Sequence, residues 1–202
     1  MKTITKYIAY DRTEIIIDGK YDCEDRDIDG AEYQTLIERC FKYSSCFSLI
    51  FRPANKGIQY PVKLRYEKQK ELPEYDKYII KSVISGKWPG TETELIGELR
   101  YYRCCKETLE MLYKFSDSIF GFEFVFGNHF NPEDPCFYRP DGTVLFASQI
   151  HEGECYLFPR EDEDFDDVLE CIPWFKEEYS EERYDRRFNN RAVGMSKEDF
   201  MV

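Results

Sequence analysis

The spacing of apolar residues near the N-terminus predicts two strands followed by a helix. The segments "TITKYIAY" and "TEIIIDG" have strand patterns and turn at Asp11 and Arg12. A helix is expected from Asp29, a favoured N-cap residue with Glu32 in the capping-box position. The apolar residues that follow fall on one helical face: Tyr33, Leu36, Ile37, Cys40 and Phe41.

The middle of the chain predicts a third strand and a second helix. The run "CFSLIFRPA" from Cys46 to Ala54 is a strand pattern that ends at a proline. Residues 58–90 mix strand and helix signals, with prolines between them. From Thr91 onward, a capping box with Glu94 begins a pattern of apolar residues at helical steps, which predicts a helix over 91–115.

The stretch "HFNPEDPCFYRPDGTVLFASQIHEGECYLF" predicts a β-meander, preceded by a strand at "GFEFVFG". The turn at Pro140-Asp141-Gly142 separates two apolar runs, and each of its residues suits a turn: proline presets φ, aspartate bonds the nearby backbone, and glycine accepts positive φ. We therefore predict an α+β fold with a mostly antiparallel sheet, a β-meander in the C-terminal half, and packed helices. One domain is expected over residues 1–175, with a charged C-terminal extension over 176–202.

Composition indicates a chain that folds and stays in the cytoplasm. Hydrophobic residues make up 42% of the sequence, with 16 Tyr and 16 Phe, whereas disordered chains are poor in such residues. The first 19 residues contain no uninterrupted apolar region of the kind found in secretory signals. No run approaches the roughly 18 apolar residues that suggest a membrane helix, so we expect no membrane association.

The eight cysteines are scattered, and none forms a C-x-x-C pair. The two histidines, His129 and His151, do not complete a zinc-binding pattern. In a reducing cytoplasm the thiols are therefore expected to be free and to bind no metal, and the sequence predicts no cofactor.

Charge is unevenly distributed along the chain, whose net charge is −12. Residues 18–32 hold seven acids and two bases, and residues 161–187 hold twelve acids and four bases, whereas 52–114 are mildly basic. An acidic balance repels phosphate backbones, so a nucleic-acid partner is not expected, and a basic protein partner is. The candidate partner-binding residues are Asp22, Glu24, Asp25, Asp27, Asp162, Glu163, Asp164, Phe165, Asp166 and Asp167.

Two other interpretations of this acidic segment stay open. The acids of 161–167 could simply be a solvated tail that keeps the protein soluble. Nearby aromatic residues, among them Phe165, Trp174, Phe175 and Tyr179, could anchor a partner or pin the segment onto the core.

No motif identifies a catalytic residue. The sequence contains no G-x-x-x-x-G-K-[ST], no G-x-S-x-G and no H-E-x-x-H, which lowers the expectation of a nucleotide-dependent enzyme, a hydrolase or a zinc protease. His151 lies beside Glu152 and near Cys155, but a cysteine nucleophile also needs a base at hydrogen-bond distance. A carboxylate pair is not distinguished among the acids either. A small enzyme with an unrecognised Cys/His or carboxylate site remains an alternative.

The acidic, aromatic-rich α+β character, with "DPCFYRPDGTVLFASQIHEGECYLF" and "EDEDFDD", resembles bacterial immunity proteins of polymorphic and contact-dependent toxin systems. That resemblance implies a protein that binds one toxin domain, often a basic nuclease, and neutralises it by direct contact. It also implies that the acidic surfaces form the contact. A regulatory or scaffold module that binds another endogenous protein would use an acidic surface in the same way.

Overall fold

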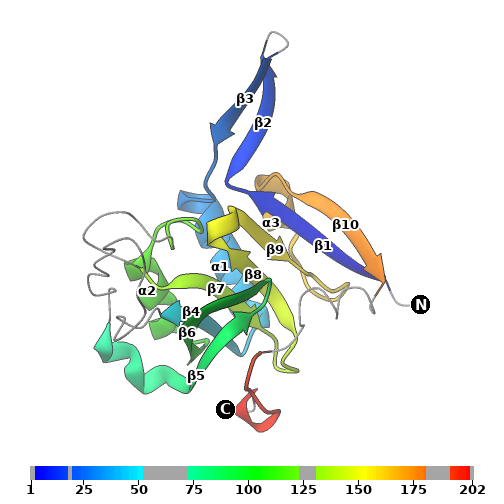
Figure 1. The fold of residues 1–202 in the computed structure, drawn as a ribbon. Helices are drawn as coiled ribbons and strands as arrows, with labels where there is room; N and C mark the ends of the chain where they lie inside the picture. Colours follow the sequence, from blue (N-terminus) through cyan, green and yellow to red (C-terminus); the bar gives the residue numbers. More distant parts are fainter. Residues whose placement is uncertain (1–2, 18–19, 52–71, 123–130, 181–191, 201–202) are drawn as a thin grey trace, which may run out of the picture.

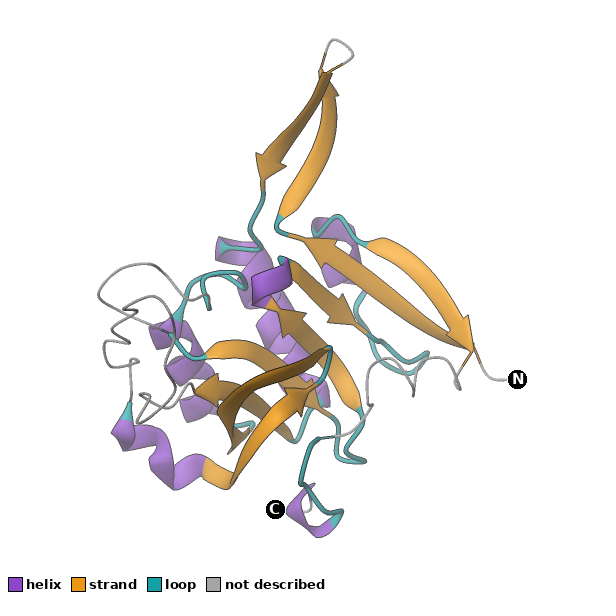
Figure 2. Cartoon of the chain, in the orientation of Figure 1, coloured by secondary structure: helices purple, strands orange, loops and turns teal. Residues whose placement is uncertain are grey.

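The computed structural model describes residues 3–17, 20–51, 72–122, 131–180 and 192–200, which form an α+β fold (Figures 1 and 2). In this part of the chain, one eight-stranded sheet has the order β10-β1-β9-β8-β7-β4-β6-β5. Its strands are β1 (Thr3–Tyr10), β4 (Cys46–Phe51), β5 (Ile79–Trp88), β6 (Thr91–Arg103), β7 (Glu133–Tyr138), β8 (Val144–Gln149), β9 (Glu154–Leu157) and β10 (Phe175–Ser180). All of its neighbouring strands pair antiparallel, so the predicted fold class is confirmed.

The α-helices pack on one face of this sheet. They are α1 (Gly30–Tyr43), α2 (Lys106–Phe115) and α3 (Asp166–Cys171), and all three contribute side chains to the larger of two hydrophobic clusters. Short 3-10 helices are η1 (Pro73–Tyr78), η2 (Ile150–Glu152) and η3 (Glu198–Phe200). The apolar face predicted for α1 is confirmed, because Tyr33, Leu36, Ile37 and Cys40 are buried. Asp29 holds the N-cap position but makes no side-chain capping bond.

Successive side chains of a strand point to opposite faces of the sheet, and a hydrophobic cluster lies on each face. On β4, Phe47 and Leu49 belong to the helix-side cluster, whereas Cys46 and Ile50 belong to the second cluster. That second cluster includes residues 192 and 200, near the C-terminal end. A strand buried on both faces reads as a continuous apolar run, as "CFSLIF" does here.

The predicted meander is confirmed for β7, β8 and β9, which are consecutive in chain and sheet. Gly142 has φ of +79°, and the Thr143 amide donates to Asp141 Oδ1 over 3.0 Å, as expected for the turn between β7 and β8. Most of the strand predicted at 121–127 lies outside the described residues. β7 begins at Glu133, so Glu133, Asp134 and Pro135 already belong to the first strand of the meander.

The helix predicted over 91–115 is wrong in its first half. Residues 91–103 form β6, which lies between β4 and β5, and α2 begins only at Lys106. Leu99 and Tyr101 are buried and alternate with the partly exposed Glu98 and Arg100, as expected for a strand. A Cβ at Gly97 would lie 2.6 Å from Ile50 Cγ2, so this glycine permits the close approach of β4.

The first two strands do not form the expected hairpin. β1 pairs with β9 and β10, whereas β2 (Arg12–Ile17) pairs with β3 (Lys20–Asp25), which lies in the acidic region 18–32. Figure 1 shows this β2–β3 hairpin projecting from the body of the protein. Its base is anchored by two backbone bonds, from Asp11 N to Gly153 O and from Arg26 N to Asp11 O.

Residues 176–202 are not simply a charged extension in the part that the structure describes. β10 adds to the sheet beside β1, and the nearly buried Lys6 joins them through Glu177, 3.1 Å away. Farther on, Ala192 and Phe200 are buried, and Tyr101 donates its hydroxyl to Val193 O over 3.0 Å. The C-terminal segment thus covers the second face of the sheet. None of the described helices has the length and apolar character needed to span a membrane.

Removing the ring of Phe200 tests this packing. The ring lies over Gly142 and is 8% exposed, so Phe200→Ala should lower the free energy of unfolding by about 2 to 4 kcal/mol. Lys197→Ala, an exposed change in the same segment, should have little effect. Chemical denaturation measures both variants. Equal and negligible changes would show that the segment does not belong to the core.

Candidate partner-binding surface

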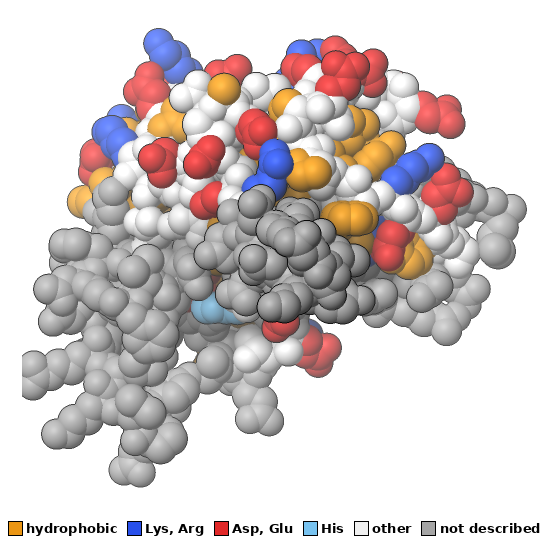
Figure 3. Space-filling model, turned by 90° about the horizontal axis from the view of Figure 1, so that it is seen from above, with side chains coloured by type: hydrophobic (Ala, Val, Ile, Leu, Met, Phe, Trp, Pro, Cys, Tyr) orange, Lys and Arg blue, Asp and Glu red, His pale blue; other side chains and the backbone are white. Residues whose placement is uncertain are grey.

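The acidic segment from Glu161 to Glu170 follows β9 and leads into α3. Five of its carboxylate side chains are exposed: Glu161, Asp162, Asp164, Asp166 and Glu170. α3 packs against α1, so this segment lies over the helical face of the sheet. Figure 3, viewed from the end that bears the hairpin, shows acidic side chains across this end with hydrophobic ones among them.

A buried ion pair fixes this segment to the meander. Glu163 accepts two bonds from Arg139, at 2.5 Å from Nε and 2.7 Å from Nη2, and their side chains are only 7% and 5% exposed. Arg139 also donates to Val144 O at 2.7 Å and to Phe158 O at 2.6 Å. A buried charge is tolerated when it is paired and hydrogen-bonded, and both conditions hold here. The segment is therefore part of the fold rather than a solvated tail.

Two further contacts hold the segment against α1. Phe165 is 1% exposed and packs its ring 5.4 Å from that of Tyr43. Asp167 accepts from Arg39 at 2.8 Å (Nη2) and 3.0 Å (Nε), and the hydrogen bond to Arg39 lowers the pKa of the carboxyl. Glu163 and Phe165 were predicted to touch a partner, but the fold uses both internally. Their role is to hold the exposed acids in place.

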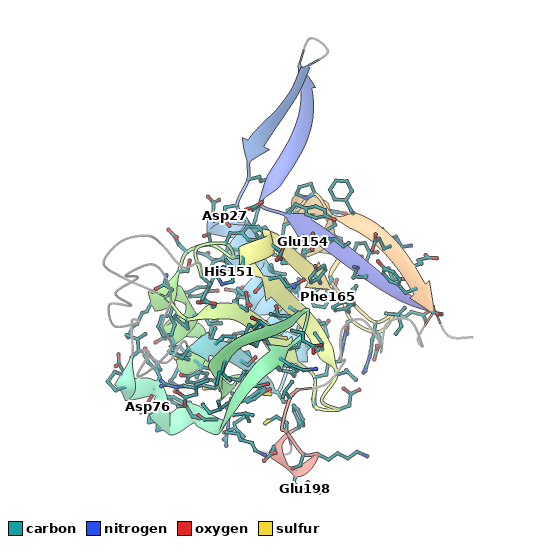
Figure 4. The ribbon with its side chains drawn as sticks, in the orientation of Figure 1. Asp27, Asp76, His151, Glu154, Phe165 and Glu198 are labelled. Atoms are coloured by element: carbon teal, nitrogen blue, oxygen red, sulfur yellow. The ribbon has the colours of Figure 1, made fainter. Side chains whose placement is uncertain are left out.

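The second predicted acidic region lies at the hairpin. Asp22, Glu24 and Asp25 belong to β3, and their side chains lie outside what the structure describes. Asp27 follows at the base of the hairpin (Figure 4), where Oδ1 accepts from the Phe120 amide over 3.0 Å. Burial raises the pKa of Asp27. Asp27 thus connects the hairpin base to the segment after α2 and is only partly available to a partner.

A buried polar cluster that the sequence did not predict lies near η2. Asp134 has φ of +48°. Its carboxylate accepts hydrogen bonds from Trp88 Nε1 at 2.7 Å and from the Ile150 amide at 2.8 Å. Burial raises the pKa of Asp134 to about 6. Its neighbour Glu133 is also buried, with Oε2 3.0 Å from His151 Nε2 at the surface. The only sequence signal was a pair of acids between prolines, in "NPEDP".

These groups do not assemble the features of a catalytic site. Asp134 is enclosed and already bonded by two N–H donors, so it joins the end of β5 to η2. The thiols of Cys136 and Cys155, the cysteines near His151 in sequence, are buried, and burial raises their pKa. A nucleophilic cysteine requires the opposite shift, toward the thiolate.

An open hollow of about 710 Å³ lies elsewhere, between η1 and the C-terminal segment. Its lining includes Lys77, Arg103 and Asp199, and Asp199 is engaged by Lys81 at 2.9 Å. Figure 4 shows Glu198, also in this lining, far down the molecule from His151. No group of three or more His, Cys, Asp or Glu residues in the described part of the chain is placed to hold a metal ion.

Breaking the buried ion pair tests how firmly the acidic segment is held. Glu163→Gln replaces one carboxylate oxygen by an NH₂ group, which cannot accept a hydrogen bond. The remaining oxygen cannot serve all the donors that Glu163 now serves, which include the Arg160 amide at 2.8 Å. The free energy of unfolding should fall by about 2 to 4 kcal/mol, because Arg139 would remain as a buried, poorly paired charge. Glu178→Gln makes the same change at an exposed pair with Lys176 and should have little effect. A similar small decrease in the free energy of unfolding for both variants would show that the Arg139–Glu163 pair does not anchor the segment.

The buried Asp134 should make stability depend on pH. Its folded pKa of about 6 exceeds the ordinary value of 3.8, so the folded protein keeps this proton while the unfolded chain has lost it. Between about pH 4 and pH 6, the stability of the wild type relative to Asp134→Asn should fall by roughly 2 to 3 kcal/mol. Asparagine also tolerates the positive φ. Denaturation across this pH range measures the difference, and a flat difference would contradict the burial.

A scan against protein-family models found no match to this chain. Searches of the curated proteins and of the solved structures also found no similar protein. The feature of this chain that bears on function is the segment 161–170, whose exposed carboxylates lie on a backbone anchored by the buried side chains of Glu163 and Phe165.

Proposed function

We propose that the chain is an immunity-type binding protein, which neutralises a basic, nuclease-like toxin domain by direct contact through its acidic surface. One observation carries this proposal: the exposed acids of 161–170 are held in a fixed arrangement by the buried Arg139–Glu163 pair and by Phe165. A surface that is ordered before binding loses less conformational entropy when a partner docks. A solvated tail would not have this advantage.

Charge gives the surface its preference for a partner. Asp162, Asp164 and Asp166 are exposed, and the segment 161–170 contains seven acids and no base. Nucleases bind phosphate backbones through lysine and arginine, so a surface of fixed carboxylates is complementary to the same basic groups. Occupation of those groups by carboxylates would keep nucleic acid away from the toxin domain.

A regulatory or scaffold module would present the same acidic surface to a basic partner. The two functions differ in what binding does to that partner. Under the immunity proposal, the isolated partner is a toxic enzyme, and an equimolar amount of this chain abolishes its activity. A partner without toxic activity would favour the regulatory alternative.

The test begins with capture of a basic protein from the source organism by the tagged chain at low salt. Association of the purified partner is then followed by stopped flow for the wild type and for the triple variant Asp162→Asn, Asp164→Asn, Asp166→Asn. The variant should associate roughly tenfold more slowly at low salt, because steering by the acids is lost. The difference should shrink at 1 M salt, where the screening length is about 3 Å.

A matched control removes three exposed acids elsewhere, through Asp76→Asn, Glu110→Gln and Asp117→Asn. It changes the net charge by the same amount, so it should slow association much less if the 161–170 surface makes the contact. If the two variants slow association equally, the acids of 161–170 act only through the net charge of the protein and do not mark the contact. Failure to obtain any basic partner with salt-dependent binding would contradict the proposed function.

A further inference from the structure

Two aromatic rings meet at the surface near the root of the projecting hairpin. Tyr10 ends β1 and Phe175 begins β10, and their ring centroids lie 5.6 Å apart in an edge-to-face arrangement. Phe175 is 60% exposed and Tyr10 is 37% exposed. The described part of the chain has two other exposed large hydrophobic residues, Ile84 and Ile96, which belong to β5 and β6. Two of these four exposed hydrophobic residues, Tyr10 and Phe175, therefore contact each other.

The exposure of Phe175 arises in a well-anchored part of the chain. The preceding Trp174 packs against the core and donates Nε1 to Val168 O over 3.0 Å. Phe175 itself pairs with Ile8 in the β1–β10 ladder. Thus Trp174 packs against the core, whereas the ring of Phe175, on a strand paired with β1, is exposed to solvent. A rigid exposed aromatic side chain is the usual anchor of a protein interface, because little entropy is lost when it binds.

The sequence on either side of Phe175 is rich in acids. Between Glu161 and Glu178 the chain has nine acids and one base, Lys176. Glu177 and Glu178, which follow Phe175, are 45% and 58% exposed, and each pairs with a lysine 3.1 Å away, Glu177 with Lys6 and Glu178 with Lys176. Interfaces typically combine an apolar centre with a charged rim. An apolar centre within this charge is complementary to a partner whose surface is basic.

We propose that Tyr10 and Phe175 form the apolar centre of the interface with the basic protein partner, and that the acidic segment forms its rim. This inference rests on the proposed function and adds the site of the anchor. The partner would place the aliphatic stem and cationic head of a lysine or arginine against the exposed ring faces, where a cation is attracted by the aromatic quadrupole.

The projecting hairpin places further contacts beside this centre. Only Asp11 separates Tyr10 from β2, and its amide bond to Gly153 O fixes the hairpin base relative to the sheet. Figure 1 shows the hairpin and α3 at the same end of the molecule. A partner docked on the aromatic pair would therefore lie between α3, which carries acids, and the base of the hairpin.

The experiment separates anchoring from charge attraction. The probe is the purified basic protein that the wild-type chain captures in a salt-dependent manner, and biolayer interferometry gives both rate constants. Phe175→Ser should increase the dissociation rate at least about tenfold and change the association rate little, because a buried anchor acts mainly on dissociation. Phe175→Trp should restore slow dissociation. Ile84→Ser is the matched control, since Ile84 is 65% exposed on the distant edge strand β5.

Thermal unfolding of each variant confirms that its fold is retained. The inference is supported if Phe175→Ser dissociates faster than Ile84→Ser and Phe175→Trp does not. It is overturned, with the proposed function intact, if acid neutralisation slows association but the Phe175 and Ile84 variants dissociate alike. If neutralisation of the acids and added salt both leave association unchanged, the proposed function fails, and the inference fails with it.

Discussion

The pairing of Arg139 with Glu163 is the constraint on which the arrangement of the C-terminal half depends. Arg139 ends the β7 arm of the meander, and its buried guanidinium bonds to β8 at Val144, to Phe158 beyond β9, and to Glu163 in the acidic segment. A buried cation without a counter-ion is costly, so the chain after β9 must return a carboxylate to this point. That return places Phe165 under α1 and leaves the neighbouring acids at the surface.

Local patterns predicted the elements whose contacts are local. The face of α1 and the turn around Gly142 follow from helical spacing and from turn chemistry, and both are present. β6 was mistaken for a helix because its apolar residues also fall at helical steps, and its alternation of buried and more exposed residues covers only a few positions around Leu99 and Tyr101. The pairing of β1 with β10 joins residues about 170 positions apart, and no local signal announces it.

The same limit applies to the candidate partner-binding surface. Phe165 and Phe175 are both aromatic residues beside acids, yet one is 1% exposed and the other 60%. The difference arises from Tyr43 and from the β1 ladder, which are distant in sequence. Asp162 and Glu163 are adjacent acids, but only Glu163 meets a buried arginine. Sequence could locate the acidic region, whereas the structure divides it into side chains that support the surface and side chains that are available to a partner.

The acidic segment is a folded part of the protein before any partner binds. Amide hydrogen exchange of the free protein tests it most directly at Leu169 and Ile172, whose amides donate to Phe165 O and Val168 O within α3. Both amides should exchange far more slowly than in an unstructured peptide, because exposing them to solvent requires release of Phe165 and of the ion pair. Exchange of both amides at the rate of an unstructured peptide would contradict it and would return the segment to the status of a solvated tail.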